Sequence, residues 1–354
     1  MKVSGKLKKV SHALVNALHR LPVVLLVVSV VMILVSIVCI TYQVTSCPER
    51  NCAKVWGQGS TVKYCHVSVF AKGARPGGES TPASYIDSGV SLVRQDLPNI
   101  HKSLQGIIAE GNWTDSYSSF TKSEVAALRT PGDASEVEIY AVGGNFKAFH
   151  PFECISGGFL PLTPVDQYHI VLNDTLAWKM YGSSDVTGER LKLWGKDYTV
   201  IGVVKDQDDD LPRAYVYFSC LEELCAGQDN PVVPSILCYE IMLPENIPGE
   251  AILEVRNTLP SQELYVENIT DRFSLSSVWD HMMPPGKNDD IVRGYEMPYW
   301  EISSEKVVKN VFAWGVVMAF GFALGVGMGG VVVMEKMRIV YGKMLLEFIQ
   351  EKEV

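Results

Sequence analysis

The segment "LWGKDYTVIGVVKD", residues 193–206, has the pattern of two antiparallel strands joined by a tight turn. Strand-forming residues occupy Arg190–Trp194 and Tyr198–Val204, and the second run alternates between two faces. Gly195, followed by a lysine, supplies the turn between the runs. The segment therefore predicts a β-hairpin in a folded, water-exposed domain.

Two long uncharged segments enclose this hairpin in the chain. Leu21–Thr41 would measure roughly 32 Å as a helix, close to the hydrocarbon thickness of a bilayer, about 30 Å. Val311–Met334 is also uncharged, and both segments exceed the length of a signal-peptide core. The motif Val44–Cys47 resembles a lipoprotein cleavage site, but the apolar stretch before it is too long. The sequence predicts two transmembrane helices with residues 42–310 between them.

The charges near the first span predict its orientation. Residues 1–20 contain five basic and no acidic residues, a composition typical of the cytoplasmic side. We therefore expect both termini in the cytoplasm and residues 42–310 on the other side of the membrane. The chain has a formal net charge of −9 despite its basic N-terminus. The outer segment is thus acidic, which argues against binding of nucleic acid.

The segments that flank the two spans have helical periodicity. In residues 1–20 apolar side chains recur on one face, which predicts either an amphipathic helix on the inner membrane surface or an extension of the span. In residues 335–354 an apolar stripe also recurs, which predicts a cytoplasmic amphipathic tail.

Two β-α-β units are predicted in the outer segment. Lys63–Phe70 is the first strand of one unit, a helix carries Ile86, Val90, Val93 and Leu97, and Leu104–Ala109 is the closing strand. Ile236–Leu243 begins the other unit, a helix follows Pro248, and Glu263–Ile269 is the return strand. Two such units commonly form one four-stranded sheet with helices on one side. The predicted fold class is α+β.

A β-rich region separates the two units. Short strands are predicted at Val137–Val142, His169–Leu172 and Ala214–Phe218, besides the hairpin. A helix interrupts them, with Asn173 as its cap and Gly182 at its end. We therefore expect one subdomain formed by residues 60–135 and 235–275, with a β-rich insertion at 136–234.

Seven of the eight cysteines lie in the outer segment, an odd number that cannot pair completely within the chain. Cys220 and Cys225 belong to one predicted helix, where their side chains diverge. The candidate disulfides are Cys65–Cys238 and Cys47–Cys52.

The motifs of common enzyme classes are missing from the sequence. It contains no GxxxxGK[ST] loop, no GxSxG and no HExxH, and its histidines lack metal-ligand spacing. The acidic run Asp206–Asp210 matches a calcium loop only at its first positions. We expect a protein that is not an enzyme, with no catalytic residues, no metal and no cofactor on this chain.

Three glycines lie at helical spacing in the second span. Gly321, Gly325 and Gly329 form a stripe of small residues that allows close helix packing. The partner could be the first span, another copy or another protein. Before this span, Tyr295, Tyr299 and Trp300 are aromatic residues of the kind that favour the membrane interface, and residues 301–334 could form one helix.

Residues 143–206 resemble the extracytoplasmic core domain of MacB-like, FtsX-like permeases of ABC transporters. The similarity is carried by "ISGGFL", "VLNDTLAWKMYG" and "GERLKLWGKDYTVIGVVKD", followed by "AYVYFS" at 214–219. The order of span, outer domain and span is also similar. The resemblance implies a porter-like subdomain with an inserted sabre-like subdomain.

The resemblance also implies a function. In this family a cytoplasmic ABC ATPase drives motion of the outer domain, which binds substrate or a partner. The tail residues Glu335, Arg338, Met344 and Phe348 lie where the family contacts its ATPase. Such permeases usually have four spans, so we expect a second permease chain or a second copy as partner. The alternatives are a membrane-anchored sensor and a scaffold similar to polysaccharide chain-length regulators.

Overall fold

The computed structural model describes residues 2–71, 92–108, 112–128, 134–205, 211–229, 231–261, 263–283, 295 and 297–352. The chain divides into two compact units. One unit combines Met1–Ser46 with Val307–Val354, and the other, the outer unit, is Cys47–Lys306. Each unit is described by itself.

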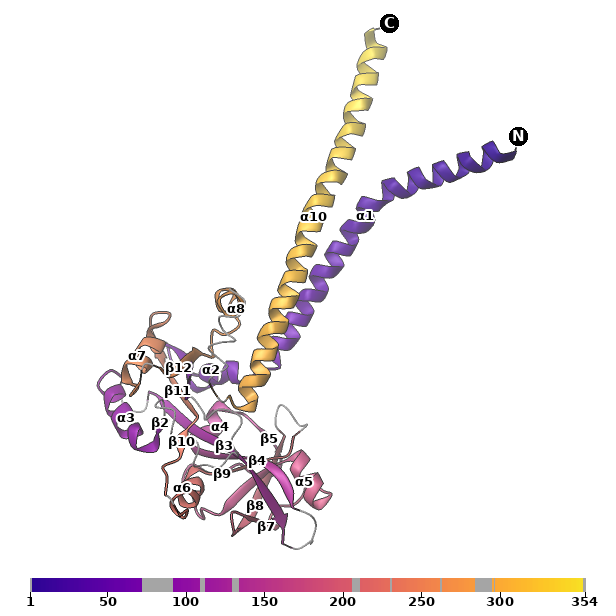
Figure 1. Ribbon diagram of the computed structural model, residues 1–354. Helices are drawn as coiled ribbons and strands as arrows, with labels where there is room; N and C mark the ends of the chain where they lie inside the picture. The colour runs from indigo at the N-terminus through magenta and orange to yellow at the C-terminus, as the bar shows by residue number, and fades with distance from the viewer. Residues whose placement is uncertain are drawn as a thin grey trace. The chain divides into compact units, whose positions relative to one another are not determined.

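The first unit is a pair of long helices, α1 (Lys2–Thr45) and α10 (Tyr299–Lys352), of which α10 begins in the outer unit. Both are long and apolar enough to cross a membrane, at Leu21–Thr45 and Tyr299–Leu345. α1 continues through Pro22, so the N-terminal segment and the first apolar stretch are one helix. Figure 1 shows a bend in α1, and proline is a common cause of such bends.

One lobe of the outer unit is the predicted four-stranded arrangement. Its strands follow the order β12-β1-β11-β3, and all neighbours are antiparallel. Their bounds are β1 Lys63–Phe70, β3 Thr114–Ala127, β11 Cys238–Glu245 and β12 Tyr265–Asn268. Helices α3 (Leu97–Gln105) and α7 (Glu250–Thr258) contact each other, and α7 contacts β1, β11 and β12. Both helices therefore cover the same face of this sheet (Figure 1).

The predicted closing strand Leu104–Ala109 is wrong. Leu104 belongs to α3, where it is buried with Leu97 and Ile100 at helical spacing. The closing strand is β3, ten residues further on. A short apolar run is compatible with a buried strand and with the buried end of a helix. Here Leu104 continues the helical spacing of the buried residues before it, so the segment begins as the end of a helix. Val93, predicted in a helix, lies in the short strand β2 (Leu92–Val93), and residues 86–90 lie outside the described residues.

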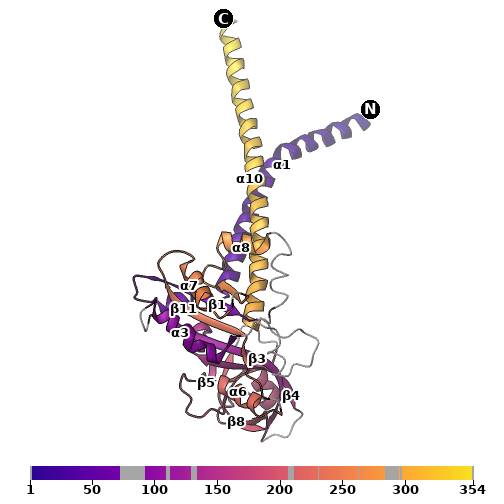
Figure 2. The same cartoon turned by 60° about the vertical axis from the view of Figure 1, so that its left-hand side comes forward.

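The β-rich lobe continues the same sheet. From β3 the order runs β4-β9-β6-β8-β5, and β7 pairs with both β3 and β8. These strands are β4 Ser135–Gly144, β5 Glu153–Gly157, β6 His169–Asn173, β7 Arg190–Leu193, β8 Lys196–Lys205 and β9 Arg213–Tyr217. β3 pairs with β11 through its first residues and with β4 and β7 further along. One strand thus belongs to the sheets of both lobes (Figure 2).

The hairpin predicted from the sequence is β7–β8. Trp194 and Gly195 connect the strands with positive φ angles of 51° and 76°, the backbone that a two-residue hairpin turn requires. Leu191, Tyr198 and Val200 are fully buried. Helix α5 (Asp174–Tyr181) is capped as predicted, because the side chain of Asn173 accepts a hydrogen bond from the Leu176 amide.

The remaining elements are short. They are η1 Pro48–Asn51, α2 Cys52–Trp56, η3 Arg94–Asp96, α4 Phe146–Phe149, α6 Phe218–Ala226, β10 Ser235–Ile236 and α8 Leu275–Met282. β10 pairs with β2 in a separate two-stranded sheet.

All eight cysteines are unpaired. The proposed Cys65–Cys238 disulfide is wrong because β1 and β11 align Cys65 with Leu243 and Cys238 with Phe70, at opposite ends of the pair. The proposed Cys47–Cys52 disulfide is also wrong, because both residues are free thiols and the Cys52 thiol is hydrogen-bonded to the Phe149 carbonyl at 3.2 Å. Cys220 and Cys225 share α6 without pairing, as predicted.

Candidate functional site: the buried joint at the start of α10

The first turn of α10 is buried inside the outer unit. Tyr299 and Trp300 are only 6% and 3% exposed, so the prediction that they lie at a membrane interface is wrong. The Tyr299 hydroxyl is 2.8 Å from the Tyr215 hydroxyl of β9. The Arg213 guanidinium lies 4.0 Å from the centre of the Tyr299 ring, within the range of a cation–π contact. These contacts fix the beginning of α10 against the β-rich lobe.

Trp300 packs among aromatic rings from the segments around it. Its ring centre lies 4.3 Å from that of His150, 5.3 Å from that of Tyr140 and 5.7 Å from that of Phe146. Phe146 belongs to α4, and His150 follows that helix directly. Burying a side chain as large as tryptophan is a strong local contribution to stability.

Glu301, the next residue of α10, binds to the other lobe. Its carboxylate accepts a hydrogen bond from Arg272, which follows β12 and is 5% exposed. Nε of Arg272 also contacts the Glu267 carboxylate of β12 at 2.9 Å. Burial and the charge of Glu267 raise the pKa of Glu301, despite the opposing attraction of Arg272. One guanidinium thus connects α10 to the edge of the four-stranded sheet.

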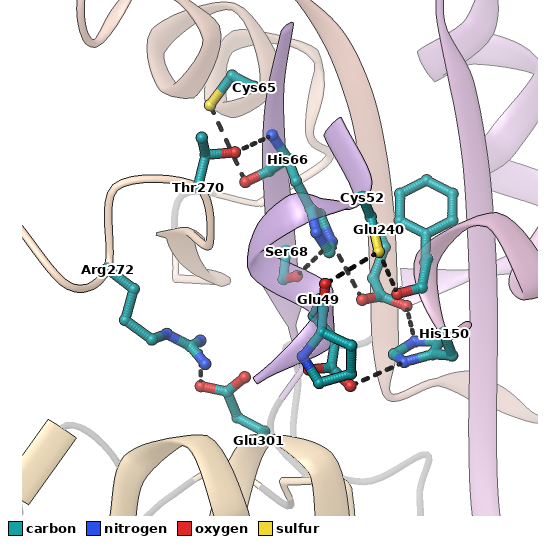
Figure 3. A network of polar contacts seen from close by, with 12 residues as sticks. Glu49, Cys52, Cys65, His66, Ser68, His150, Glu240, Thr270, Arg272 and Glu301 are labelled. Carbon is teal, nitrogen blue, oxygen red and sulfur yellow. Dashed lines mark hydrogen bonds and ion pairs between the residues drawn. The ribbon is translucent and has the colours of Figure 1, made fainter. Parts of the chain in front are cut away.

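A second buried carboxylate, Glu240 of β11, lies between two imidazoles (Figure 3). Its oxygens are 3.2 Å from Nε2 of His66 and 2.7 Å from Nε2 of His150. Burial by itself raises the pKa of Glu240, but the charge of His150 and hydrogen bonds from both imidazoles lower it to about 2. Burial lowers the pKa of His150, and the two glutamates around it raise that pKa to about 9. Near neutral pH Glu240 and His150 therefore form a buried ion pair.

The residues that follow α1 complete the cluster. Glu49 in η1 is buried, and its carboxylate lies 3.9 Å from Nδ1 of His150. The Cys52 thiol donates to the carbonyl of Phe149 at 3.2 Å. Burial, with the charges of Glu49 and Glu240, raises the pKa of Cys52 to about 12, so this thiol stays protonated.

These residues form what we call the joint: Glu49, His66, His150, Glu240, Arg272, Tyr299, Trp300 and Glu301. Figure 3 shows its charged members converging from several segments of the outer unit. The joint brings together the residues that follow α1, the first turn of α10, and strands of the four-stranded sheet. The contacts of Tyr299 and Trp300 with Tyr215 and Tyr140 also connect the first turn of α10 to the β-rich lobe.

The joint does not have the geometry of a hydrolytic triad. The Ser68 hydroxyl and the Glu240 carboxylate both contact the same nitrogen of His66, at 3.4 and 3.2 Å. In a catalytic triad the histidine uses one nitrogen for the nucleophile and the other for the carboxylate. His66 and Glu240 are also 1% and 2% exposed. The arrangement is suited to holding segments together.

The predicted glycine stripe faces α1 within the helix pair. A Cβ atom built on Gly325 would lie 2.9 Å from Oγ of Ser29, and one on Gly321 would lie 3.3 Å from Ile33, Met32 and the Ser29 backbone. At Gly329 the nearest atom belongs to Leu26, at 3.8 Å. The three glycines therefore share one contact face.

The predicted tail residues lie in the last part of α10. Glu335, Arg338 and Met344 are helical, and the Met344 side chain is exposed. Phe348 is helical too, but its side chain is not among those that the structure describes. The acidic run Asp206–Asp210, considered above as a calcium loop, lies outside the described residues.

Sequence reasoning missed the joint. One signal was present: in "CYEIML", residues 238–243, a glutamate stands in the middle of an apolar strand. A charge buried in a strand needs a partner, and His66 on the neighbouring strand is one. No local pattern links Glu240 to His150 or Arg272 to Glu301, because these contacts depend on the tertiary fold.

A comparison with family models identifies one family. The family model described as the MacB-like periplasmic core domain matches residues 24–235, more than half of the chain. A search of curated proteins found no match.

Three solved structures are similar to parts of the chain. The periplasmic region of MacB from Actinobacillus actinomycetemcomitans is 12% identical, with a TM-score of 0.42, over 58% of this chain and 88% of that one. The extracellular domain of the noncanonic ABC-type transporter YknZ from Gram-positive bacteria is 14% identical, with a TM-score of 0.37, over 54% and 88%. A domain of a putative permease protein from Porphyromonas gingivalis is 17% identical, with a TM-score of 0.32, over 58% and 87%.

Proposed function

This chain belongs to the family of the MacB-like periplasmic core domain, and from that membership we propose that it is a permease-type subunit of an ABC transporter. Its outer unit binds a substrate or a partner protein and relays motion that a cytoplasmic ATPase drives. The subunit itself is not an enzyme and holds no cofactor. The observation that carries the proposal is the joint, in which the first turn of α10 is built into both lobes of the outer unit.

To relay motion from the cytoplasm, α10 must be attached firmly to the outer unit at a defined point. Tyr299 and Trp300 supply an apolar anchor, and Glu301 supplies a charged contact of fixed geometry with Arg272. Buried ion pairs are weak sources of net stability, but a broken one is costly, so they favour one arrangement over others. α10 is continuous from this anchor to Lys352. Movement of the helix is thereby passed to the outer unit.

In this proposal α1 and α10 cross the plasma membrane of a bacterium, both termini lie in the cytoplasm, and the outer unit lies outside. The basic residues of segment 1–20 support that orientation. The close approach of Gly325 to Ser29 supports packing of the two spans within one chain. A second permease chain, or a second copy of this one, supplies the further spans of the transporter.

We place the ATPase contact on the tail of α10. Glu335, Arg338, Met344 and Phe348 lie in the last part of that helix. Met344 is exposed and available for a partner.

Copurification from native membranes tests the proposal. We expect the full chain to bring down an ABC ATPase and a permease chain. Met344→Glu should reduce recovery of the ATPase. Ile339→Glu is the matched control, because Ile339 is equally exposed but lies about 140° away around the helix.

Other partners would overturn the proposal. A signalling kinase without an ATPase would favour a sensor, and a polymerase would favour a scaffold. The scaffold has less support, because the longest described helices that lie wholly in the outer unit have only nine residues.

A further inference from the structure

Helix α8 carries large apolar side chains that the rest of the outer unit does not cover. Leu275 is 90% exposed and Trp279 is 59% exposed, whereas Val278 is buried and attaches the helix to the outer unit. Leu275 and Trp279 are four residues apart, so they lie on one face. Met283, just past the helix, is 40% exposed. An exposed tryptophan beside exposed aliphatic side chains marks a surface that contacts something apolar.

The position of α8 in the chain indicates what that surface meets. α8 begins three residues after Arg272, whose guanidinium is bonded to Glu301 in the first turn of α10. The uncharged stretch of α10 begins at Val311, ten residues after Glu301, or about 15 Å along the helix. α8 is itself about 12 Å long. In Figure 1, α8 lies at the side of the outer unit where α10 starts.

The chemistry of α8 favours lipid over an acidic partner. Its sequence, "LSSVWDHM", contains neither lysine nor arginine, so it has no fixed positive charge for anionic headgroups. Tryptophan has an apolar ring with one polar N–H, and this combination favours the boundary between headgroups and acyl chains. Short amphipathic helices lie in that boundary with their apolar face toward the acyl chains.

We propose that α8 is an interfacial membrane helix, with Leu275 and Trp279 inserted into the outer leaflet of a zwitterionic bilayer. It gives the outer unit a third attachment to the membrane, besides α1 and α10. The inference rests on the proposed crossing of the membrane by α10.

Quenching of tryptophan fluorescence by brominated lipid tests this contact. The full chain is placed in nanodiscs of phosphatidylcholine brominated near the headgroup end of its acyl chains. With seven tryptophans, each contributes about one seventh of the emission. Trp279→Phe should remove about one seventh of the total emission, all of it from the quenched component. Trp178→Phe is the matched control, because Trp178 is 57% exposed on α5 of the β-rich lobe, and it should leave the quenched component unchanged.

Trp314 separates the two ways in which the inference could fail, because it lies in the apolar stretch of α10. If Trp314→Phe reduces the quenched component and Trp279→Phe does not, the inference about α8 is wrong and a protein partner becomes the occupant of its exposed face. If neither does, the membrane crossing by α10 fails as well. Both variants should give the circular dichroism spectrum of the wild-type chain.

Discussion

Glu240 is the residue on which the joint depends most. Its carboxylate is 2% exposed and bonded to imidazoles from two different segments, β1 and the residue after α4. A carboxylate removed from water is very unfavourable unless it is paired and hydrogen-bonded. Glu240 therefore holds His66 and His150 close together, and the ring of His150 in turn packs against that of Trp300 of α10.

Glu240→Gln should destabilise the outer unit strongly. The neutral amide leaves His150 without its balancing charge, and breaking a buried pair in this way costs about 3–5 kcal/mol. Glu223→Gln is the control: its carboxylate pairs with Lys196 at 2.9 Å on the surface, where solvent screens the pair and its loss costs little stability. Denaturant unfolding of the full chain in detergent, followed by near-ultraviolet circular dichroism, measures both. Equal stability of the two variants would contradict the role given to Glu240.

The ion pair also predicts how stability depends on pH. The pKa of His150 is raised to about 9, so its contribution is complete below pH 6.5 and is lost as the pH rises to 9. The pKa of Glu240 is lowered to about 2, so its contribution is complete above pH 4.5 and is lost as the pH falls to 2. The pair is therefore strongest between pH 4.5 and 6.5.

Between pH 6.5 and 9 the free energy of unfolding should fall by on the order of 3 kcal/mol through His150 alone. Glu301, whose pKa is also raised, contributes a loss in the same direction as the pH rises above 4.5. His150→Gln isolates the histidine, because the variant should lack its share of the fall. A variant with the same decline as the wild-type chain would show that His150 carries no proton in the folded state.

Single residues were predictable from sequence where local geometry determines them. Asn173 and Gly182 at the ends of α5 and Gly195 in the hairpin turn have roles set by a few neighbouring residues. Bonded members of the joint lie far apart in the chain, 174 positions in the case of His66 and Glu240. Tyr299 and Trp300 were misplaced for the same reason, since nothing local distinguishes an interfacial aromatic residue from a buried one.

At the scale of elements, the helix pair depends on small residues at its contact. Gly321 and Gly325 of α10 leave room for Ser29 of α1, whose hydroxyl donates to the Leu26 carbonyl of its own helix. Lipid offers no hydrophobic drive for helices to associate, so close backbone contact carries much of the attraction. A side chain at Gly325 would meet the Ser29 side chain within 2.9 Å and push the helices apart.

Gly325→Leu should separate α1 from α10, whereas Gly327→Leu should not, because a Cβ atom on Gly327 meets nothing within 4 Å. Spin labels on non-canonical residues at the exposed positions Val27 and Val326 report the separation by pulsed electron resonance in nanodiscs. We expect a longer, broader distance distribution for Gly325→Leu only. Identical distributions for the two variants would count against the stripe.

Elements were predictable where hydrophobic period and turn residues agree. β1, the hairpin and α5 appear where the sequence indicates them. The region between β1 and β4 was harder, because apolar residues directly follow the end of α3 and β3 is a long strand of mostly polar residues, "TDSYSSFTKSEVAA". Several of its polar side chains, such as Ser116 and Ser118, are buried, which an alternating apolar pattern does not reveal.

At the scale of the whole molecule, the two lobes of the outer unit are one hydrogen-bonded sheet. β3 pairs with β11 in one lobe and with β4 and β7 in the other, so a movement of one lobe relative to the other must bend or twist this strand. The joint connects α10 to both of the lobes that β3 joins: Glu301 bonds to Arg272 in one lobe, and Tyr299 bonds to Tyr215 in the other. The proposed relay of motion therefore has a defined starting point at Tyr299–Glu301.

Hydrogen exchange at the first turn of α10 tests this account most directly. This turn precedes the uncharged stretch of the helix, so lipid does not protect it, and protection beyond that of an unattached helix end reports its attachment to the outer unit. In the full chain in nanodiscs, amides of residues 301–306 should exchange as slowly as those of β11. Trp300→Ala should accelerate them at least tenfold, while Trp178→Ala, at an exposed site, should not. Fast exchange in the wild-type chain, or no acceleration by Trp300→Ala, would contradict the joint.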